Sequence, residues 1–382
     1  MAEPQSDLAA AVDPGAVADP AAVADQGAAP TLLLVTGPGR SGTSAITGAL
    51  SQLGVHVPPP LVGWNKSNQR GFYETRWVVD FQKRVLATAH TYEFDSDPVA
   101  ISRIGEVADE KLRAELTEWL RGAVSGRQQA VIKDPRSVWL NDLWVDAAKA
   151  NGLEISYLTM LRHPTEVVGS RSEYYGTPSQ KRESRDYAIS KVAGWINVSL
   201  LNERQTRGRR RVYLRYTDLL ADWRTALGRV SDGIGLEFNA SLAPGESNPV
   251  DDFISPELHR IKTSWDELDV PAELRQLADE VWAACERLAD EGGDADLGEV
   301  FDALSERYFR LYRDAAAIAF DTRSWAVASE RAEWRRKLRR VNRKLTKTEK
   351  DLAAARQPAK RPGRVTRFGR RVVRGVRRRI GR

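Results

Sequence analysis

The sequence predicts an α/β fold of three layers, in which helices flank both faces of a mostly parallel β-sheet. Four short apolar runs, at residues 31–36, 129–132, 154–161 and 211–216, have the length and composition of buried strands. Segments with apolar residues at helical spacing separate these runs, and strands that alternate with helices are typical of a parallel sheet. Ligand sites of such folds lie at the carboxyl ends of the strands, so we expect the site among the residues that follow each run.

The 382 residues carry a formal net charge of +6, but this charge is divided unevenly along the chain. Residues 331–382 hold 22 lysines and arginines against three acidic residues, a net charge of +19, so residues 1–330 carry −13. A hydrophobic content of 42% is enough for one large core or two small ones. We therefore expect an acidic globular part followed by a basic tail that has an anionic partner.

Composition and spacing divide the chain into four parts. Residues 1–30 are rich in alanine and proline, lack aromatic residues and are predicted to be a disordered leader. The α/β domain follows at 31–310, a helical segment at 311–357, and a polybasic amphipathic tail at 358–382. The helical segment resembles a short coiled coil, since its apolar residues are spaced by four, three, four and seven positions at Trp334, Leu338, Val341, Leu345 and Leu352.

The basic residues 331–382 are predicted to bind an anionic membrane surface, because an apolar stripe among arginines suits a helix on lipid headgroups. A polybasic tail without fixed structure is the alternative, and the coiled-coil-like segment also allows a homodimer. Nucleic acid is not the expected partner, since no aromatic residues are interleaved with the basic ones as a recognition surface. No apolar run approaches the roughly 18 residues of a membrane span. The N-terminus also lacks a signal-peptide pattern, so we expect a cytoplasmic protein held peripherally at the inner face of the membrane.

The first predicted strand runs into a glycine-rich loop at residues 37–44, GPGRSGTS, and a helix begins at Thr43. Glycines let the backbone turn tightly and approach a ligand, and the N–H groups and dipole of a helix N-terminus favour an anion. Gly37 and Gly42 have the spacing of a Walker A motif, but Thr43 stands where that motif has its lysine. Arg40 supplies a cation instead. The loop therefore predicts an anion site that differs from the usual nucleotide loop.

This loop closely resembles the 5′-phosphosulfate loop of the sulfotransferases that use 3′-phosphoadenylyl sulfate (PAPS), particularly the carbohydrate-directed and bacterial branches with arginine in place of lysine. A second segment, LRHPTEVVGSR at residues 161–171, places Arg162 at a strand end and Ser170 eight residues later. It matches the 3′-phosphate motif of the same family, R-x-P-x-x-x-x-x-S, in residue types and spacing. A guanidinium offers two parallel N–H donors to a phosphate, and a serine hydroxyl adds a third.

The resemblance covers about residues 31–220 and implies a P-loop-like fold with PAPS-dependent sulfotransferase activity. The acceptor it implies is a hydroxyl of a carbohydrate, a glycolipid or a related small metabolite. Tyr216 belongs to RYTDL, which resembles the Y-E-D-L segment of the family and suggests stacking on adenine, although Thr217 replaces the usual glutamate. The predicted nucleotide-binding residues are Gly39, Arg40, Ser41, Gly42, Thr43, Ser44, Arg162, Ser170 and Tyr216.

Sulfuryl transfer requires in-line positioning and stabilisation of charge on the leaving oxygen. A sulfuryl group carries less negative charge than a phosphoryl group, so arginine can take the place of Mg²⁺ and we expect no metal. Arg40 is therefore the predicted catalytic cation, with Lys133 and Arg136 facing the transfer zone or the acceptor. The general base that an acceptor hydroxyl needs is assigned to Glu74, with His56 as the rival.

Glu74 is preferred because it closes NQRGFYE, residues 68–74, which resembles the N-P-x-G-[YF]-x-E stretch of bacterial sulfotransferases with Gln69 in place of the proline. Two other functions stay open at this point. The first is a P-loop-type kinase or nucleotide phosphotransferase, which the missing lysine at position 43 disfavours. The second is a non-enzymatic, membrane-docked adaptor, in which the pair of Arg162 and Ser170 would have no use.

Overall fold

The computed structural model describes residues 29–65, 68, 70–175, 184–291 and 297–356. The predicted leader, apart from its last two residues, lies outside the described residues, as do Gln69 and the predicted polybasic tail at 358–382. Contacts within the chain group it into two units, Met1–Tyr312 and Arg313–Arg382.

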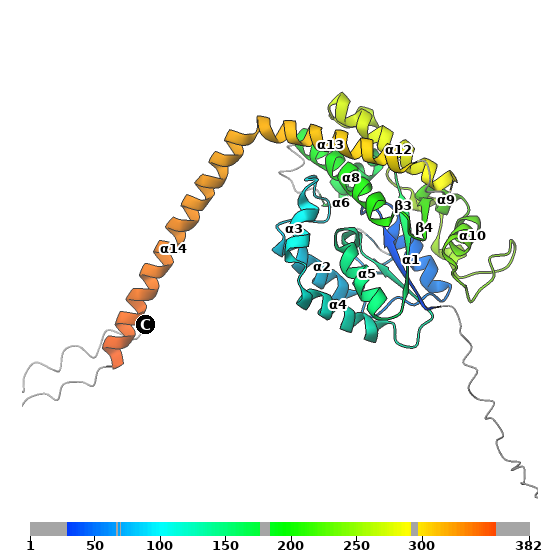
Figure 1. Ribbon diagram of the computed structural model, residues 1–382, viewed down its shortest axis with the longest axis horizontal. Helices are drawn as coiled ribbons and strands as arrows, with labels where there is room; N and C mark the ends of the chain where they lie inside the picture. The colour runs from blue at the N-terminus through cyan, green and yellow to red at the C-terminus, as the bar shows by residue number, and fades with distance from the viewer. Residues whose placement is uncertain (1–28, 66–67, 69, 176–183, 292–296, 357–382) are drawn as a thin grey trace, which may run out of the picture. The chain divides into compact units, whose positions relative to one another are not determined.

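A sheet of four parallel strands forms the centre of the first unit (Figure 1). The strands are β1 (Thr31–Thr36), β2 (Gln129–Lys133), β3 (Glu154–Leu161) and β4 (Arg211–Arg215), in the order β2-β1-β3-β4. Every neighbouring pair is parallel, and all six residues of the central strand β1 are buried. A parallel sheet that is apolar on both faces must be covered on both faces. The predicted α/β fold is therefore confirmed.

Helices connect the strands and provide this cover. In the first unit they are α1 (Thr43–Gln52), α2 (Arg76–Thr88), α3 (Ala100–Val107), α4 (Glu110–Ala123), α5 (Asn141–Ala150), α6 (Pro164–Tyr175), α8 (Ser184–Thr206), α9 (Tyr216–Ala221), α10 (Trp223–Ile234), α11 (Val250–Phe253) and α12 (Ala272–Glu291). Three short 3₁₀ helices are η1 (Pro135–Leu140), η2 (Pro256–Leu258) and η3 (Trp265–Glu267). Since α1, η1, α6 and α9 each begin just after a strand ends, four helical N-termini face the same edge of the sheet.

Side chains of β1 point alternately to the two faces of the sheet. Leu32 and Leu34 belong to a core with α2, α3, α4 and α5, whereas Leu33 and Val35 belong to a second core with α1, α9, α10 and α11. Figure 1 shows α2, α4 and α5 gathered on one side of the strands and α9 and α10 on the other. A third core packs α6 and α8 against α12 and the first turns of α13 (Gly298–Ile318). Both faces of the sheet are therefore covered by packed helices.

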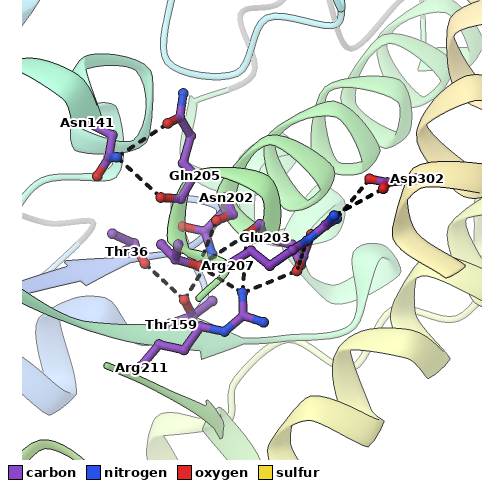
Figure 2. A network of polar contacts seen from close by, with 10 residues as sticks. Thr36, Asn141, Thr159, Asn202, Glu203, Gln205, Arg207, Arg211 and Asp302 are labelled. Atoms are coloured by element: carbon purple, nitrogen blue, oxygen red, sulfur yellow. Dashed lines mark hydrogen bonds and ion pairs between the residues drawn. The ribbon is translucent and has the colours of Figure 1, made fainter. Parts of the chain in front are cut away.

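A buried polar network joins α8 to the sheet (Figure 2). The hydroxyls of Thr36, at the end of β1, and Thr159, two residues before the end of β3, lie 3.0 Å apart, and the Asn202 side-chain amide donates to Thr159 at 2.9 Å. The Asn141 side-chain amide donates to the main-chain and side-chain oxygens of Gln205. Buried hydroxyls and amides stabilise a fold only when they are paired, so these bonds fix α8 against the strand ends that precede the glycine loop.

An ion-pair cluster continues the network away from the sheet edge (Figure 2). The Glu203 carboxylate is 1% exposed and accepts from Arg207 at 2.6 Å and from Arg211 at 3.2 Å. Arg207 also pairs with Asp302 of α13 at 2.9 Å. Two guanidinium groups therefore face two carboxylates, and the cluster ties α8, β4 and α13 together.

The second unit contains α14 (Phe320–Arg356), a single helix of 37 residues. Its coiled-coil-like stripe is exposed to solvent: Trp334 is 62% exposed, Leu338 60% and Leu345 56%. No helix within the described residues is both long and apolar enough to cross a membrane.

Candidate active site

A cavity of about 570 Å³ lies at the carboxyl edge of the sheet, where all four strands end. The loop after β1, the end of β2 at Lys133, Arg162 after β3 and Tyr216 after β4 all line it. Eight lysine or arginine side chains and two glutamates line the described part of the cavity. This is a strongly basic hollow in a part of the chain that is otherwise acidic.

The glycine loop is held in a conformation that its sequence demands. Gly37 and Gly42 have φ angles of 105° and 90°, which side chains rarely allow, and Arg40 adopts φ 80° between them. A Cβ at Gly37 would lie 2.5 Å from the Met160 carbonyl oxygen, and one at Gly42 would overlap the Tyr216 ring. The loop is therefore packed against β3 and α9. It opens α1 at Gly42 without a side-chain cap, which leaves the helix N-terminus suited to an anion.

The two predicted phosphate motifs meet in the folded chain. The Arg40 Nε donates to the Ser170 hydroxyl at 2.9 Å, across 130 residues of sequence. Arg162 donates through Nη1 to the Arg40 carbonyl at 3.1 Å, through Nε to Glu166 at 2.8 Å and through Nη2 to the Ile261 carbonyl at 2.9 Å. A guanidinium has five N–H donors, so two remain beyond these three bonds. The contact between the motifs makes one continuous basic surface.

Tyr216 lines the cavity but is only 7% exposed. Its hydroxyl donates to the Leu258 carbonyl at 3.1 Å, and the Arg162 guanidinium lies 5.2 Å from its ring centroid. Because Gly42 approaches the same ring, the tyrosine packs between the glycine loop and the second phosphate motif. This geometry gives Tyr216 a role in supporting the loop, beside the stacking role that the resemblance implies.

Lys133 and Glu74 form a buried ion pair beside the loop. The Lys133 ammonium is 2% exposed and donates to Glu74 at 2.6 Å, to the Phe72 carbonyl at 3.0 Å and to the Ser44 hydroxyl at 3.1 Å. These three bonds use all three N–H donors of the lysine. Residue 73, a tyrosine, has φ 53°, a strained backbone conformation of the kind that collects at functional sites. Lys133 therefore links Glu74, the predicted base, to Ser44 of the predicted anion loop.

Two further carboxylates, Asp134 and Glu93, hold two arginines of the cavity wall. Asp134 is fully buried and accepts from the main chain and the guanidinium of Arg136, the latter at 2.7 Å. Glu93 accepts from Arg171 at 3.1 Å and from Arg136 at 3.4 Å. Glu93 also lies beside the loop, since a Cβ at Gly39 would lie 2.5 Å from its carboxylate. Both arginines are thus fixed in orientation before any ligand binds.

The two carboxylates differ in their protonation. Burial raises the pKa of Asp134 to about 6 and outweighs the opposing effect of Arg136, while nearby Glu74 and Glu93 raise this pKa further. Burial acts in the same direction on Glu93, but the positive charges of Arg171, Arg136 and Lys133 together outweigh it and hold the pKa of Glu93 below its usual value. Glu93 is therefore a permanent anion near neutral pH, and Asp134 titrates close to the physiological range.

The structure does not bring His56 to this cavity. Its backbone pairs with Ala130, near the start of β2, and its Nε2 lies 3.1 Å from the Ala123 carbonyl oxygen at the end of α4. Lys133, at the end of the same strand, is three residues further on, about 10 Å away at the rise of a β-strand. A helix that follows a parallel strand returns the chain to the opposite edge of the sheet, and His56 comes directly after such a helix. Ser41 is also fully buried and does not line the cavity.

Several residues of the cavity were not predicted from the sequence. Arg171 follows the predicted Ser170 directly, but Glu93 and Arg260 lie far from any motif and reach the cavity only through tertiary packing. The unpredicted charged residues that line it are Arg70, Lys83, Glu93, Arg171 and Arg260. Within the described residues, no group of three or more histidine, cysteine or acidic side chains is arranged to hold a metal ion.

No family model matches the chain, and no curated protein matches it significantly. Among solved structures it is similar to the sulfotransferase domain of an olefin synthase from Synechococcus PCC 7002, with 20% identity and a TM-score of 0.37 over 66% of this chain and 93% of that one. A sulfotransferase domain from the curacin biosynthetic pathway has 14% identity and a TM-score of 0.38 over 66% and 97%. A sulfotransferase from Mycobacterium tuberculosis has 15% identity and a TM-score of 0.35 over 67% and 77%.

Proposed function

We propose that this chain transfers the sulfuryl group of PAPS to a hydroxyl of a carbohydrate, a glycolipid or a related metabolite. The observation that carries the proposal is the contact between Arg40 and Ser170, because it joins the two predicted phosphate motifs in one cavity. Either motif alone would fit an ordinary nucleotide as well as a donor with anionic groups at its 5′ and 3′ positions. Together they supply two anion sites on neighbouring strands, β1 and β3.

The residues of the cavity fit such a donor. PAPS carries a phosphosulfate at its 5′ position and a phosphate at its 3′ position, and the described cavity walls carry eight cationic side chains against two carboxylates. Arg40, with the N–H groups at the start of α1, would hold the 5′ group, and Arg162 with Ser170 would hold the 3′ phosphate. Gly42 leaves no room for a side chain beside Tyr216, so the backbone itself forms this part of the wall.

Glu74 and Lys133 are placed for the transfer step. In the proposed reaction the acceptor oxygen forms a bond to sulfur as the bond from sulfur to the 5′-phosphate oxygen breaks, which releases adenosine 3′,5′-bisphosphate. Glu74 accepts the proton of the acceptor hydroxyl. Lys133 bonds both to Glu74 and to Ser44 of the loop, so its charge stabilises the negative charge that develops on the transferred and leaving oxygens.

We also propose that the protein works at a membrane surface. The net charge of +19 over residues 331–382 would hold the enzyme at an anionic membrane surface by electrostatic attraction. A cytoplasmic enzyme attached at the inner face of the membrane would then meet a lipid-linked or surface acceptor. Binding to vesicles with and without anionic lipid tests this part separately.

The nucleotide is tested first, by thermal unfolding with adenosine 3′,5′-bisphosphate and, separately, with ATP and Mg²⁺. A ligand at 100 times its dissociation constant stabilises the native state by about 2.7 kcal/mol, which is a measurable shift. We expect stabilisation by the bisphosphate. Stabilisation by ATP and Mg²⁺ alone would favour a kinase, and no effect from either would favour a non-enzymatic adaptor.

The base is tested with Glu74→Gln in a transfer assay that uses ³⁵S-labelled PAPS, a panel of saccharides and a total lipid extract. Loss of a general base lowers turnover roughly 10²- to 10⁴-fold. Glutamine still offers an oxygen to Lys133, and retained binding of the bisphosphate shows that the site is folded. Glu118→Gln, on the exposed surface of α4, is the matched control. Undiminished turnover in Glu74→Gln would remove Glu74 from the mechanism.

A further inference from the structure

We propose that α14 pairs with α14 of a second copy of the chain as a parallel, in-register, two-stranded coiled coil. The seam is the α14 stripe, defined as Trp334, Leu338, Val341, Leu345, Thr348 and Leu352. Its steps of four and three alternate without a break, which is the heptad period of a left-handed coiled coil. The five apolar members are each between 51% and 62% exposed, so this helix presents an apolar line that a partner would bury.

The stripe is too narrow for a helix that lies flat on lipid. Such helices bury an apolar face at least about 100° wide, whereas a coiled-coil seam uses only two positions of each heptad. Next to the α14 stripe, Arg335 and Lys337 flank Trp334 and Leu338, and Lys344 and Glu349 flank Leu345 and Thr348. Charged residues on both sides leave the seam as the one apolar strip of this part of α14.

The charges beside the seam fit a second copy of the chain in parallel orientation. The core positions of a heptad are called a and d, and the positions that flank them are called e and g. In a parallel pair, a residue at g on one helix faces the residue at e five places later on the other helix. Glu330 then faces Arg335 of the second copy, and Lys344 faces Glu349 of the second copy. Both pairs join opposite charges, and each occurs twice because the dimer has two-fold symmetry. The intervening pair, Lys337 with Asn342, has one charge only.

In an antiparallel pair with the same stripe fully overlapped, Leu338 lies opposite Thr348 and Val341 lies opposite Leu345. The flanking residues that then meet are Lys337 with Asp351 and Arg335 with Glu349, which attract, and Lys344 with Lys344, which repels. The parallel pair has no like-charge contact among the flanking pairs named above and places Thr348 opposite Thr348 rather than opposite Leu338, so we infer the parallel orientation. The surplus positive charge of α14 lies mostly on the outer face, at Arg336, Arg339, Arg340, Arg343, Lys347 and Lys350, where salt screens the repulsion between helices.

Sedimentation of the full chain with single-cysteine cross-linking tests both the partner and the orientation. Thr348→Cys places a thiol in the seam without removing an apolar residue, and a parallel pair brings it opposite its own copy. We expect a mass of two chains and an oxidised dimer on a non-reducing gel. Arg343→Cys, on the outer face, is the matched control and should not cross-link. The native Cys285 is buried, so it gives little background.

A charge exchange identifies the register. Lys344→Glu replaces two attractive pairs with two repulsive ones and should weaken dimerisation roughly tenfold at low salt. Adding Glu349→Lys restores opposite charges only in the parallel, in-register pair, so the double variant should recover the dimer. The two positions are five residues apart, too far along one helix to pair within a chain. A monomer at tens of micromolar, a dimer without Thr348→Cys cross-links, or a double variant no stronger than Lys344→Glu would overturn the proposal.

Discussion

Two clusters of arginines and carboxylates in the first unit look alike in composition but differ in balance. In the network of Figure 2, Arg207 and Arg211 face Glu203 and Asp302, one charge for one, and Glu203 is 1% exposed. Around the cavity of about 570 Å³, eight cationic side chains and two glutamates form the described lining, and Asp134 and Glu166 pair with two of the arginines from outside it. The first cluster is closed by the chain itself, whereas the second has an excess of positive charge that an anion would neutralise.

Two physical criteria separate structural ion pairs from a binding site. A buried charge without a partner costs several kcal/mol, so a cluster that only supports the fold balances its charges. A surplus of like charge next to a hollow opposes folding unless a ligand is bound there, and it persists where function needs it. Charge composition alone does not draw this distinction, since both clusters consist of arginines and acids; in the sequence only the glycine loop and the spacing of Arg162 and Ser170 indicate the second cluster.

Removal of one charge from the closed cluster should give the largest effect. In Glu203→Gln, Arg207 and Arg211 lose their shared carboxylate while Arg211 stays buried. Breaking a buried pair on one side costs about 3–5 kcal/mol, so we expect unfolding free energy to fall by that amount in urea titrations. Affinity for adenosine 3′,5′-bisphosphate should stay unchanged below the new midpoint.

An exposed pair is the control for this variant. Arg121 and Glu118 form an ion pair on the surface of α4, with side chains 59% and 74% exposed. Exposed pairs contribute about 0–1 kcal/mol, so Glu118→Gln should barely move the urea midpoint. Equal losses in Glu203→Gln and Glu118→Gln would contradict the view that the network of Figure 2 is what supports α8.

A substitution in the cavity cluster should lower ligand affinity and leave stability nearly unchanged. Arg40→Ala removes a cation that holds the proposed ligand, and a hydrogen bond to a charged group contributes about 1.5–3 kcal/mol. Affinity for the bisphosphate should therefore fall roughly 10- to 100-fold by calorimetry. The bond from Arg162 to the carbonyl of residue 40 persists in the variant, so the unfolding free energy without ligand should change little.

Arg84→Ala provides the control for Arg40→Ala. Arg84 pairs with Glu115 outside the cavity, and its side chain is 54% exposed. It should leave both affinity and stability as in the wild type. If Arg40→Ala instead destabilised the chain strongly and bound the bisphosphate normally, the cavity would be a structural cluster like that of Figure 2.

The sequence predicted what local patterns determine. Apolar runs placed β1 and β3 at their observed bounds and β2 and β4 within one residue. A strand that ends in a glycine loop must put that loop at the carboxyl edge, so Arg40 could be placed from the sequence. The same was true of Arg162 and Ser170, because their separation of eight residues fits a strand end and a helix of known rise.

The rest depends on long-range packing. Glu93 reaches the cavity because the segment between α2 and α3 folds back onto Arg136 and Arg171, and no local spacing encodes that approach. His56 was the rival base because the chain has only four histidines, a reason that does not depend on position. The end of α1 lies at the edge of the sheet opposite the cavity, so topology places His56 outside the cavity lining.

Asp134 combines features of both clusters and gives the smallest predicted effect. Its Oδ1 is bonded to Arg136, but its Oδ2 is buried without a hydrogen-bond partner among the described residues, and burial raises the pKa of this carboxyl to about 6. A raised pKa means that the ionised form is the less favourable one in the folded state. Wild-type stability relative to Asp134→Asn should therefore be greatest below about pH 4 and should decline as pH rises through about 6, by roughly 1–3 kcal/mol in total. Glu93, whose pKa is lowered, contributes the opposite trend to both proteins and cancels in the difference.

Urea titrations of wild type and Asp134→Asn at pH 5 and pH 7.5 measure the change. A stability difference that is the same at both pH values would show that Asp134 is ionised throughout and fully stabilised by Arg136.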